Sequence, residues 1–126
     1  MDKRRHKRHK GKCGAFAVFL KPDEFMNLGQ VLDISLGGVS VKYLSTAKQE
    51  GQCSEIKIFG SNGRFIHVDK LPCHVVYDVE IPEGSWNQIS CRRCGVQFDN
   101  LNVRHLSMLQ DFIDHFTQAE KPTEAM

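Results

Sequence analysis

The sequence has no long hydrophobic run. Its longest uninterrupted apolar stretch, Ala15 to Leu20, spans six residues, whereas a membrane-spanning helix needs about 20. The same stretch is short for the hydrophobic region of a signal peptide, and the small-residue triplets near it lie before or inside it rather than after it. These absences predict a soluble protein that stays in the cytoplasm.

A second cysteine pair of the kind found in zinc sites is also missing. Cys91 and Cys94 form one Cys-x-x-Cys pair, but a structural zinc ion needs four ligands, usually from two such pairs. In a strand, moreover, residues three positions apart lie on opposite faces of the sheet. The five cysteines cannot all pair, so we expect reduced, mostly buried thiols and no metal site. They are Cys13, Cys53, Cys73, Cys91 and Cys94.

No arrangement typical of a catalytic site is present in the sequence. We find no nucleophile beside a base, and neither a His-Asp spacing nor a pair of carboxylates stands out. The six histidines are explained more simply as residues of the basic N-terminus, of strands and of a helix. We therefore expect that the protein is not an enzyme.

Positive charge is concentrated at the N-terminus. Residues 1–12 hold seven of the 17 lysines and arginines and one of the 15 acidic residues, although the net charge of the whole chain is only +2. A cluster of like charges repels itself and stays solvated unless it meets an anionic partner. We predict a mobile basic arm over residues 1–12. Taken alone, such an arm is most simply a solubilising tail or a nonspecific contact with nucleic acid.

The rest of the chain indicates one mainly β domain. A length of 126 residues, with 40% hydrophobic and 25% charged residues, is typical of a single globular domain. Short apolar segments separated by turn residues predict strands, and the Asn62-Gly63 pair predicts a tight hairpin. The expected strands cover residues 13–20, 28–34, 39–44, 54–59, 64–68, 75–81 and 87–98.

The period-two pattern also predicts which side chains face the interior. Asp33, by contrast, is expected to point away from the core. The residues expected to face inward are Leu28, Leu32 and Ile34 in the second strand, Val39, Val41 and Tyr43 in the third, Val75, Tyr77, Val79 and Ile81 in the sixth, and Cys94, Val96 and Phe98 in the last.

The C-terminal segment has the periodicity of a helix. Leu106, Leu109, Ile113 and Phe116 recur every three or four residues, as on the buried stripe of an amphipathic helix, and Asn102 can cap its start. We predict a helix over residues 103–118 and a disordered tail over 119–126. The expected fold is a small antiparallel β-barrel of six or seven strands over residues 13–118, closed by this helix.

A polar loop joins two of the predicted strands at the tip of a hairpin. It reads Asp33-Ile34-Ser35-Leu36-Gly37-Gly38. Asp33 and Ser35 offer short hydrogen-bonding side chains, while Gly37 and Gly38 permit positive φ and let a ligand approach the backbone. Such a string also arises in hairpin turns for conformational reasons alone, so it gains weight only from a second motif.

The second motif lies in the basic arm. Arg4-x-x-x-Arg8 precedes Asp33-x-Ser35-x-x-Gly38 by about 25 residues. This combination resembles the PilZ domain, a bacterial receptor for cyclic di-GMP (c-di-GMP), in which Arg-x-x-x-Arg is followed by (Asp/Asn)-x-Ser-x-x-Gly. The resemblance implies the same small barrel.

The resemblance extends toward the C-terminus. Cys94-Gly95-Val96-Gln97-Phe98 is similar to the Gly-Val-x-Phe strand of the family, and a helix-like segment follows it. The resemblance therefore covers nearly the whole chain. It implies a c-di-GMP receptor that orders its arm over the barrel when ligand binds and relays the signal to an unidentified protein partner.

The implied ligand requires donors for two phosphates and for guanine edges. An arginine guanidinium forms bidentate hydrogen bonds to either group and stacks on flat bases. Asp33 and Ser35 are implied to bind guanine edges, Gly38 to let the base approach, and Arg5 to add charge. The ligand-binding residues expected on this basis are Arg4, Arg5, Arg8, Asp33, Ser35, Gly37 and Gly38.

Two alternatives stay open. The first is a nucleic-acid-binding barrel that uses the same basic arm, but it leaves the polar loop without a role, and the sequence shows no row of aromatic residues positioned for base stacking. The second is a PilZ-like adaptor that binds only protein, but such an adaptor does not need arginines at this spacing.

Overall fold

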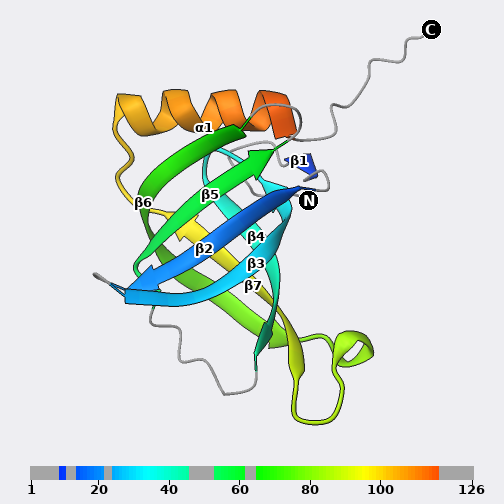
Figure 1. Cartoon of the computed structure of the whole chain (residues 1–126). Coiled ribbons are helices and arrows are strands. Elements are labelled where there is room, and N and C mark those ends of the chain that lie inside the picture. The colour runs from blue at the N-terminus through cyan, green and yellow to red at the C-terminus, as the bar shows by residue number, and fades with distance from the viewer. Residues whose placement is uncertain (1–8, 11–13, 22–23, 46–52, 62–64, 117–126) are drawn as a thin grey trace, which may run out of the picture.

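The computed structural model describes residues 9–10, 14–21, 24–45, 53–61 and 65–116. These residues form seven strands, one 3-10 helix and one α-helix (Figure 1). In chain order the elements are β1 (His9–Lys10), β2 (Ala15–Lys21), β3 (Glu24–Ile34), β4 (Gly38–Ser45), β5 (Glu55–Ser61), β6 (Phe65–Glu80), η1 (Pro82–Gly84), β7 (Ser90–Phe98) and α1 (Val103–Phe116).

Six of the strands close into a barrel. The order is β3-β2-β5-β6-β7-β4, and a further pairing between β3 and β4 joins the two ends. All of these pairs are antiparallel. Closure satisfies backbone groups that an open sheet would leave at its edges. The six-stranded antiparallel barrel with a C-terminal helix confirms the predicted fold.

The strand β1 was not predicted. His9 pairs with Ile34 and Lys10 pairs with Asp33, so two residues of the expected arm lie along the end of β3. The other residues assigned to the arm lie outside the described part of the chain.

The interior of the barrel follows the predicted alternation on β4 and β7. Val39, Val41 and Tyr43 on β4 are buried. On β7 the side chains of Cys94, Val96 and Phe98 are buried in the same core. Each of these two strands is paired with another strand on both sides. The alternation of buried side chains along them therefore shows which face lines the core.

The prediction for β3 was wrong at Leu28, which is exposed on the outer surface. Val31 pairs with Val41 and Asp33 pairs with Ser40, which leaves Leu32 as an extra residue. Such a bulge shifts the faces of a strand by one position. Val31 and Ile34 are therefore the buried residues on either side of it.

The segments predicted as separate strands at 64–68 and 75–81 belong to one 16-residue strand, β6. Its first half pairs with β5 and its second half with β7. Val75 pairs with Val96 while Tyr77 pairs with Gly95, so Val76 is an extra residue. This irregularity explains why Val79, predicted to face inward, is exposed. The predicted hairpin between β5 and β6 is confirmed.

The helix α1 covers one end of the barrel, opposite the end where η1 lies (Figure 1). Asn102 caps it as predicted, because its Oδ1 accepts a hydrogen bond from the backbone N–H of His105 at 2.8 Å. Leu106, expected in the buried stripe, is 38% exposed. The side chains that α1 buries are Leu109, Phe112, Ile113 and Phe116.

Among the described residues, no helix has the length and apolar character needed to cross a membrane. The segments predicted as the end of the helix at 117–118 and as the disordered tail at 119–126 lie outside the described residues.

Candidate functional site

The loop between β3 and β4 is held by Ser35. Its backbone N–H donates to the carbonyl of Gly38 at 2.8 Å. Its hydroxyl oxygen accepts hydrogen bonds from the backbone N–H groups of Gly37, at 3.0 Å, and Gly38, at 3.2 Å. The residue is only 6% exposed. Ser35 thus stabilises the turn itself, a role that the sequence analysis did not assign to it.

Positive φ, which the sequence analysis expected glycine to permit at Gly37 and Gly38, explains neither residue. Neither adopts positive φ; among the described glycines, Gly14 is the one that does. A Cβ on Gly38 would overlap the carbonyl oxygen of Val96 on β7. The carbonyl of Gly37 accepts from the N–H of Phe98 at 2.9 Å. Close approach to β7 therefore accounts for Gly38.

A polar network crosses the outer face of the barrel beside this loop. Arg93 Nη2 lies 3.2 Å from Asp33 Oδ2, and Arg93 Nε donates to Ser40 Oγ at 3.0 Å. The hydroxyl groups of Ser40 and Tyr77 lie 3.1 Å apart. These four side chains come from β3, β7, β4 and β6. They place Asp33 at one end of a continuous polar strip, in which Ser40 is buried and the other three side chains are partly exposed.

The strip depends on Gly95. Ser40 and Tyr77 both pair with Gly95 across β7, and a Cβ there would collide with the Tyr77 ring. The ring therefore lies over the bare backbone of Gly95, and its hydroxyl reaches Ser40. The sequence analysis did not assign Arg93 to the site, and it was wrong to place Tyr77 on the inward face, because the extra residue Val76 reverses the face of β6 at this point. The predicted inward position of Cys94 implies that its neighbour Arg93 faces outward, and this was the available signal, but the partner of Arg93 is 60 residues away in the chain.

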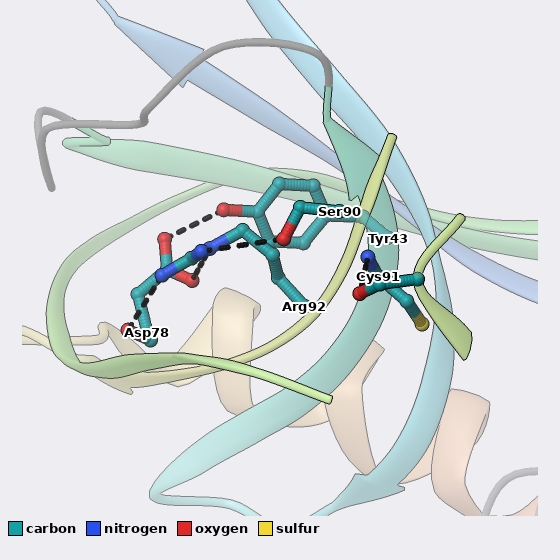
Figure 2. A network of polar contacts seen from close by, with 6 residues as sticks. Tyr43, Asp78, Ser90, Cys91 and Arg92 are labelled. Carbon is teal, nitrogen blue, oxygen red and sulfur yellow. Dashed lines mark hydrogen bonds and ion pairs between the residues drawn. The ribbon is translucent and has the colours of Figure 1, made fainter. Parts of the chain in front are cut away.

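A second network lies further along β6 and β7 (Figure 2). Tyr43 Oη donates to Asp78 Oδ2 at 2.6 Å, and Arg92 Nε donates to Asp78 Oδ1 at 2.8 Å. Arg92 also donates to the Asp78 carbonyl at 3.1 Å and approaches Ser90 Oγ at 3.5 Å. Burial, followed by the bond to Asp78, raises the pKa of Tyr43 above its ordinary range. Asp78 and Arg92 are mostly buried, and their contacts with Tyr43 link β4, β6 and β7.

The predicted arginines Arg4, Arg5 and Arg8 lie outside the described residues. The structure nevertheless describes the backbone that follows them. Lys10 pairs with Asp33 and His9 with Ile34, so the chain directly after Arg8 runs along the strand that leads into the polar loop.

The thiols of Cys91 and Cys94 lie apart, as expected from their spacing. Cys94 belongs to the barrel core, whereas the Cys91 sulfur lies close to Gly84 of η1. No group of three or more metal-ligating side chains occurs within the described ranges.

An aromatic row on the outer surface corrects one expectation. Phe16 and Phe59 are cross-strand partners with ring centroids 5.9 Å apart. Phe65 lies 6.3 Å from Phe59 and 6.2 Å from His67. The sequence analysis found no row of aromatic residues, because these side chains are brought together only by the pairing of β2, β5 and β6.

Together, the closed six-stranded barrel, the helix across one end and the polar loop between β3 and β4 define a small antiparallel β-barrel protein. Comparison with family models matches residues 2–115 to the PilZ domain. The chain therefore belongs to the PilZ domain family. A search of curated proteins found no match.

Solved structures share this fold. The PilZ domain of YcgR from Escherichia coli with c-di-GMP matches at a TM-score of 0.65 and 21% identity, covering 91% of this chain and 92% of that one. The K. pneumonia MrkH–c-di-GMP complex matches at 0.64 and 16%, covering 89% and 51%. Bacillus subtilis MotI/DgrA matches at 0.59 and 13%, covering 90% and 51%. At these identities the likeness concerns the fold.

Proposed function

We propose that this protein is a bacterial receptor for c-di-GMP and acts by binding, without catalysis. The family supports this proposal, as do the relatives solved with that ligand. The observation that carries it is the pairing of Lys10 with Asp33. It brings the segment that follows Arg8 beside the acidic residue of the second motif, although the two motifs are far apart in the sequence.

The residues of the proposed site suit this ligand chemically. Arg4 and Arg8 would bind phosphate oxygens or the Hoogsteen edges of guanine through bidentate contacts, with Arg5 adding charge. The carboxylate of Asp33 would accept hydrogen bonds from guanine. Ser35 and the glycines Gly37 and Gly38 would hold the loop in the shape that presents Asp33 and exposes backbone to the base.

Binding would also provide the signal. Two phosphates would offset the repulsion within the basic arm, so the arm would become ordered over the barrel and present a new surface to a protein partner. Hydrogen exchange tests this step. With ligand, exchange should slow in the arm and in residues 33–38 together, and it should barely change in α1. An arm whose exchange rate is the same with and without saturating ligand contradicts the relay.

Isothermal titration of the full chain with c-di-GMP tests the proposed function directly. We expect saturable binding that a short single-stranded oligonucleotide does not compete away. Absence of binding at high protein concentration, with the fold verified by circular dichroism, contradicts the proposal.

The aromatic row of Phe16, Phe59, Phe65 and His67 favours a second candidate function. Exposed rings on a barrel surface can stack bases of a single strand. If the oligonucleotide binds and c-di-GMP does not, this candidate replaces the first. Phe65→Ala should then weaken oligonucleotide binding, since Phe65 is 64% exposed and its loss leaves the core intact.

A further inference from the structure

Two thiols that the proposed function does not use lie next to each other inside the barrel. The Sγ atoms of Cys53 and Cys73 are 3.9 Å apart, and the residues are 7% and 5% exposed. Cys53 lies two residues before the start of β5, and Cys73 lies in the middle of β6. Neither is bonded in a disulfide.

The backbone around the pair fixes this approach. Ser54 donates its N–H to the carbonyl of Leu20 at 3.0 Å, and its own carbonyl accepts from the N–H of Cys73 at 3.0 Å. The chain at Cys53 is therefore tied to β2 on one side and to β6 on the other. A disulfide needs a sulfur separation of about 2.05 Å. Rotation of the Cys53 and Cys73 side chains would have to supply the remaining approach from 3.9 Å.

The two thiols differ in chemical character. The hydrogen bond between them lowers the pKa of Cys53 and raises the pKa of Cys73, and burial raises the latter further. The thiolate is the reactive form of cysteine. Cys53 lies before β5, whereas Cys73 is held in the middle of β6. We therefore assign the first attack to Cys53, and Cys73, whose Sγ is 3.9 Å away, resolves the product.

We propose that Cys53 and Cys73 are an oxidisable thiol pair, which a small peroxide converts into a disulfide that joins the start of β5 to β6. The Cys53 thiolate attacks one peroxide oxygen, so an S–O bond forms and the O–O bond breaks, with hydroxide leaving and becoming water. The Cys73 sulfur then attacks Cys53, the S–S bond forms, and the S–O bond breaks as hydroxide takes the Cys73 proton. Two thiols and one hydrogen peroxide give one disulfide and two waters. A dithiol reductant reverses the change by exchange.

The cross-link has a structural path to the polar loop. Cys73 pairs with Phe98 across β6 and β7, and the Phe98 N–H donates to the carbonyl of Gly37.

Closing the loop of chain between the two cysteines restricts the unfolded state. Oxidation should therefore raise the melting temperature by roughly 10 °C for a loop and a domain of this size.

The test treats the reduced full chain with a small excess of hydrogen peroxide and then alkylates it with N-ethylmaleimide in denaturant. We expect two fewer alkylated thiols, a peptide linking Cys53 to Cys73 after proteolysis, and reversal by dithiothreitol. Cys91→Ser is the matched control and should still form the link, while Cys53→Ala and Cys73→Ala should each prevent it.

If a variant fails to fold, peptide mapping of the unmodified chain after peroxide treatment decides the question. Retention of all five thiols after peroxide treatment overturns the proposal, as does a linkage between other cysteines. Conversion of Cys53 to sulfinic acid without a cross-link also overturns it, because Cys73 would then not act as the resolving thiol.

Discussion

Arg93 on β7 and Asp33 on β3 form an ion pair on the outer face of the barrel, with 3.2 Å between Nη2 and Oδ2. The strand β4 lies between them, and its Ser40 accepts from the same guanidinium. The acidic residue of the proposed site is therefore positioned by an arginine outside both sequence motifs.

The first prediction concerns this arginine. Arg93→Ala should weaken c-di-GMP binding by about twofold to fivefold, because a half-exposed ion pair contributes modestly and its loss frees Asp33 to move. Lys42→Ala is the matched control. Lys42 is the cross-strand neighbour of Arg93 and is exposed. Its substitution therefore removes the same charge and leaves Asp33 and its ion pair in place. Titration calorimetry measures the c-di-GMP affinity of both variants. Tighter binding by the Arg93 variant would mean that Arg93 competes with the ligand for Asp33.

The second prediction separates specific hydrogen bonding from general electrostatics. Asp33→Ala removes a negative charge, which by itself favours an anionic ligand, yet it should weaken c-di-GMP binding if Asp33 accepts from guanine. Asp69→Ala removes the same charge from an exposed position on β6 and should leave affinity equal or slightly higher. Equal or stronger binding by both variants would remove Asp33 from the site.

The third prediction addresses the arm. Arg8→Ala and Arg4→Ala should each lower c-di-GMP affinity by at least about tenfold, because a charge-assisted contact contributes about 1.5 to 3 kcal/mol. Arg104→Ala on α1, an exposed arginine, is the control and should bind as the unmodified chain does. If neither arm variant differs from this control in titrations, the arm takes no part in binding.

The fourth prediction concerns Gly38. A methyl group at this position would overlap the Val96 carbonyl, so Gly38→Ala should lower the free energy of unfolding by about 1 to 3 kcal/mol, the range typical of overpacking. Urea denaturation measures this loss. A variant that keeps full stability but loses c-di-GMP binding would show instead that Gly38 is required by the ligand rather than by the fold.

The fifth prediction follows from Tyr43. Its hydroxyl donates to Asp78, so Tyr43→Phe should lower the free energy of unfolding at pH 7 by about 1 to 2 kcal/mol. The pKa of Tyr43 is raised in the folded state, so the folded protein holds this proton more tightly than the unfolded chain does. That stabilisation is complete below a pH of about 10 and declines above it.

Urea midpoints at pH 7 and pH 10.5 measure this dependence. Cys94, whose pKa burial raises to about 12, also reduces stability at alkaline pH, and it does so in both proteins. The Tyr43→Phe variant should therefore lose less stability between the two pH values than the unmodified chain. An equal loss in both would show that Tyr43 does not contribute.

The sequence by itself determined the features that depend on neighbours in the chain. The alternation of Val39, Val41 and Tyr43 predicted a buried face because side chains of a strand point to opposite sides in turn. Asn102 predicted the start of α1 because its cap needs only the next three residues. The two motifs predicted the family, which the match over residues 2–115 confirmed.

Only the tertiary structure decided the rest, because closing a barrel sets the register between strands that are far apart in sequence. The extra residues Leu32 and Val76 shift a strand by one position, and such a shift reverses every face beyond it. Arg93 meets Asp33 across 60 residues, and Cys53 meets Cys73 across 20. Each of these contacts depends on which strands pair and in which register, and no local pattern of residues encodes that choice.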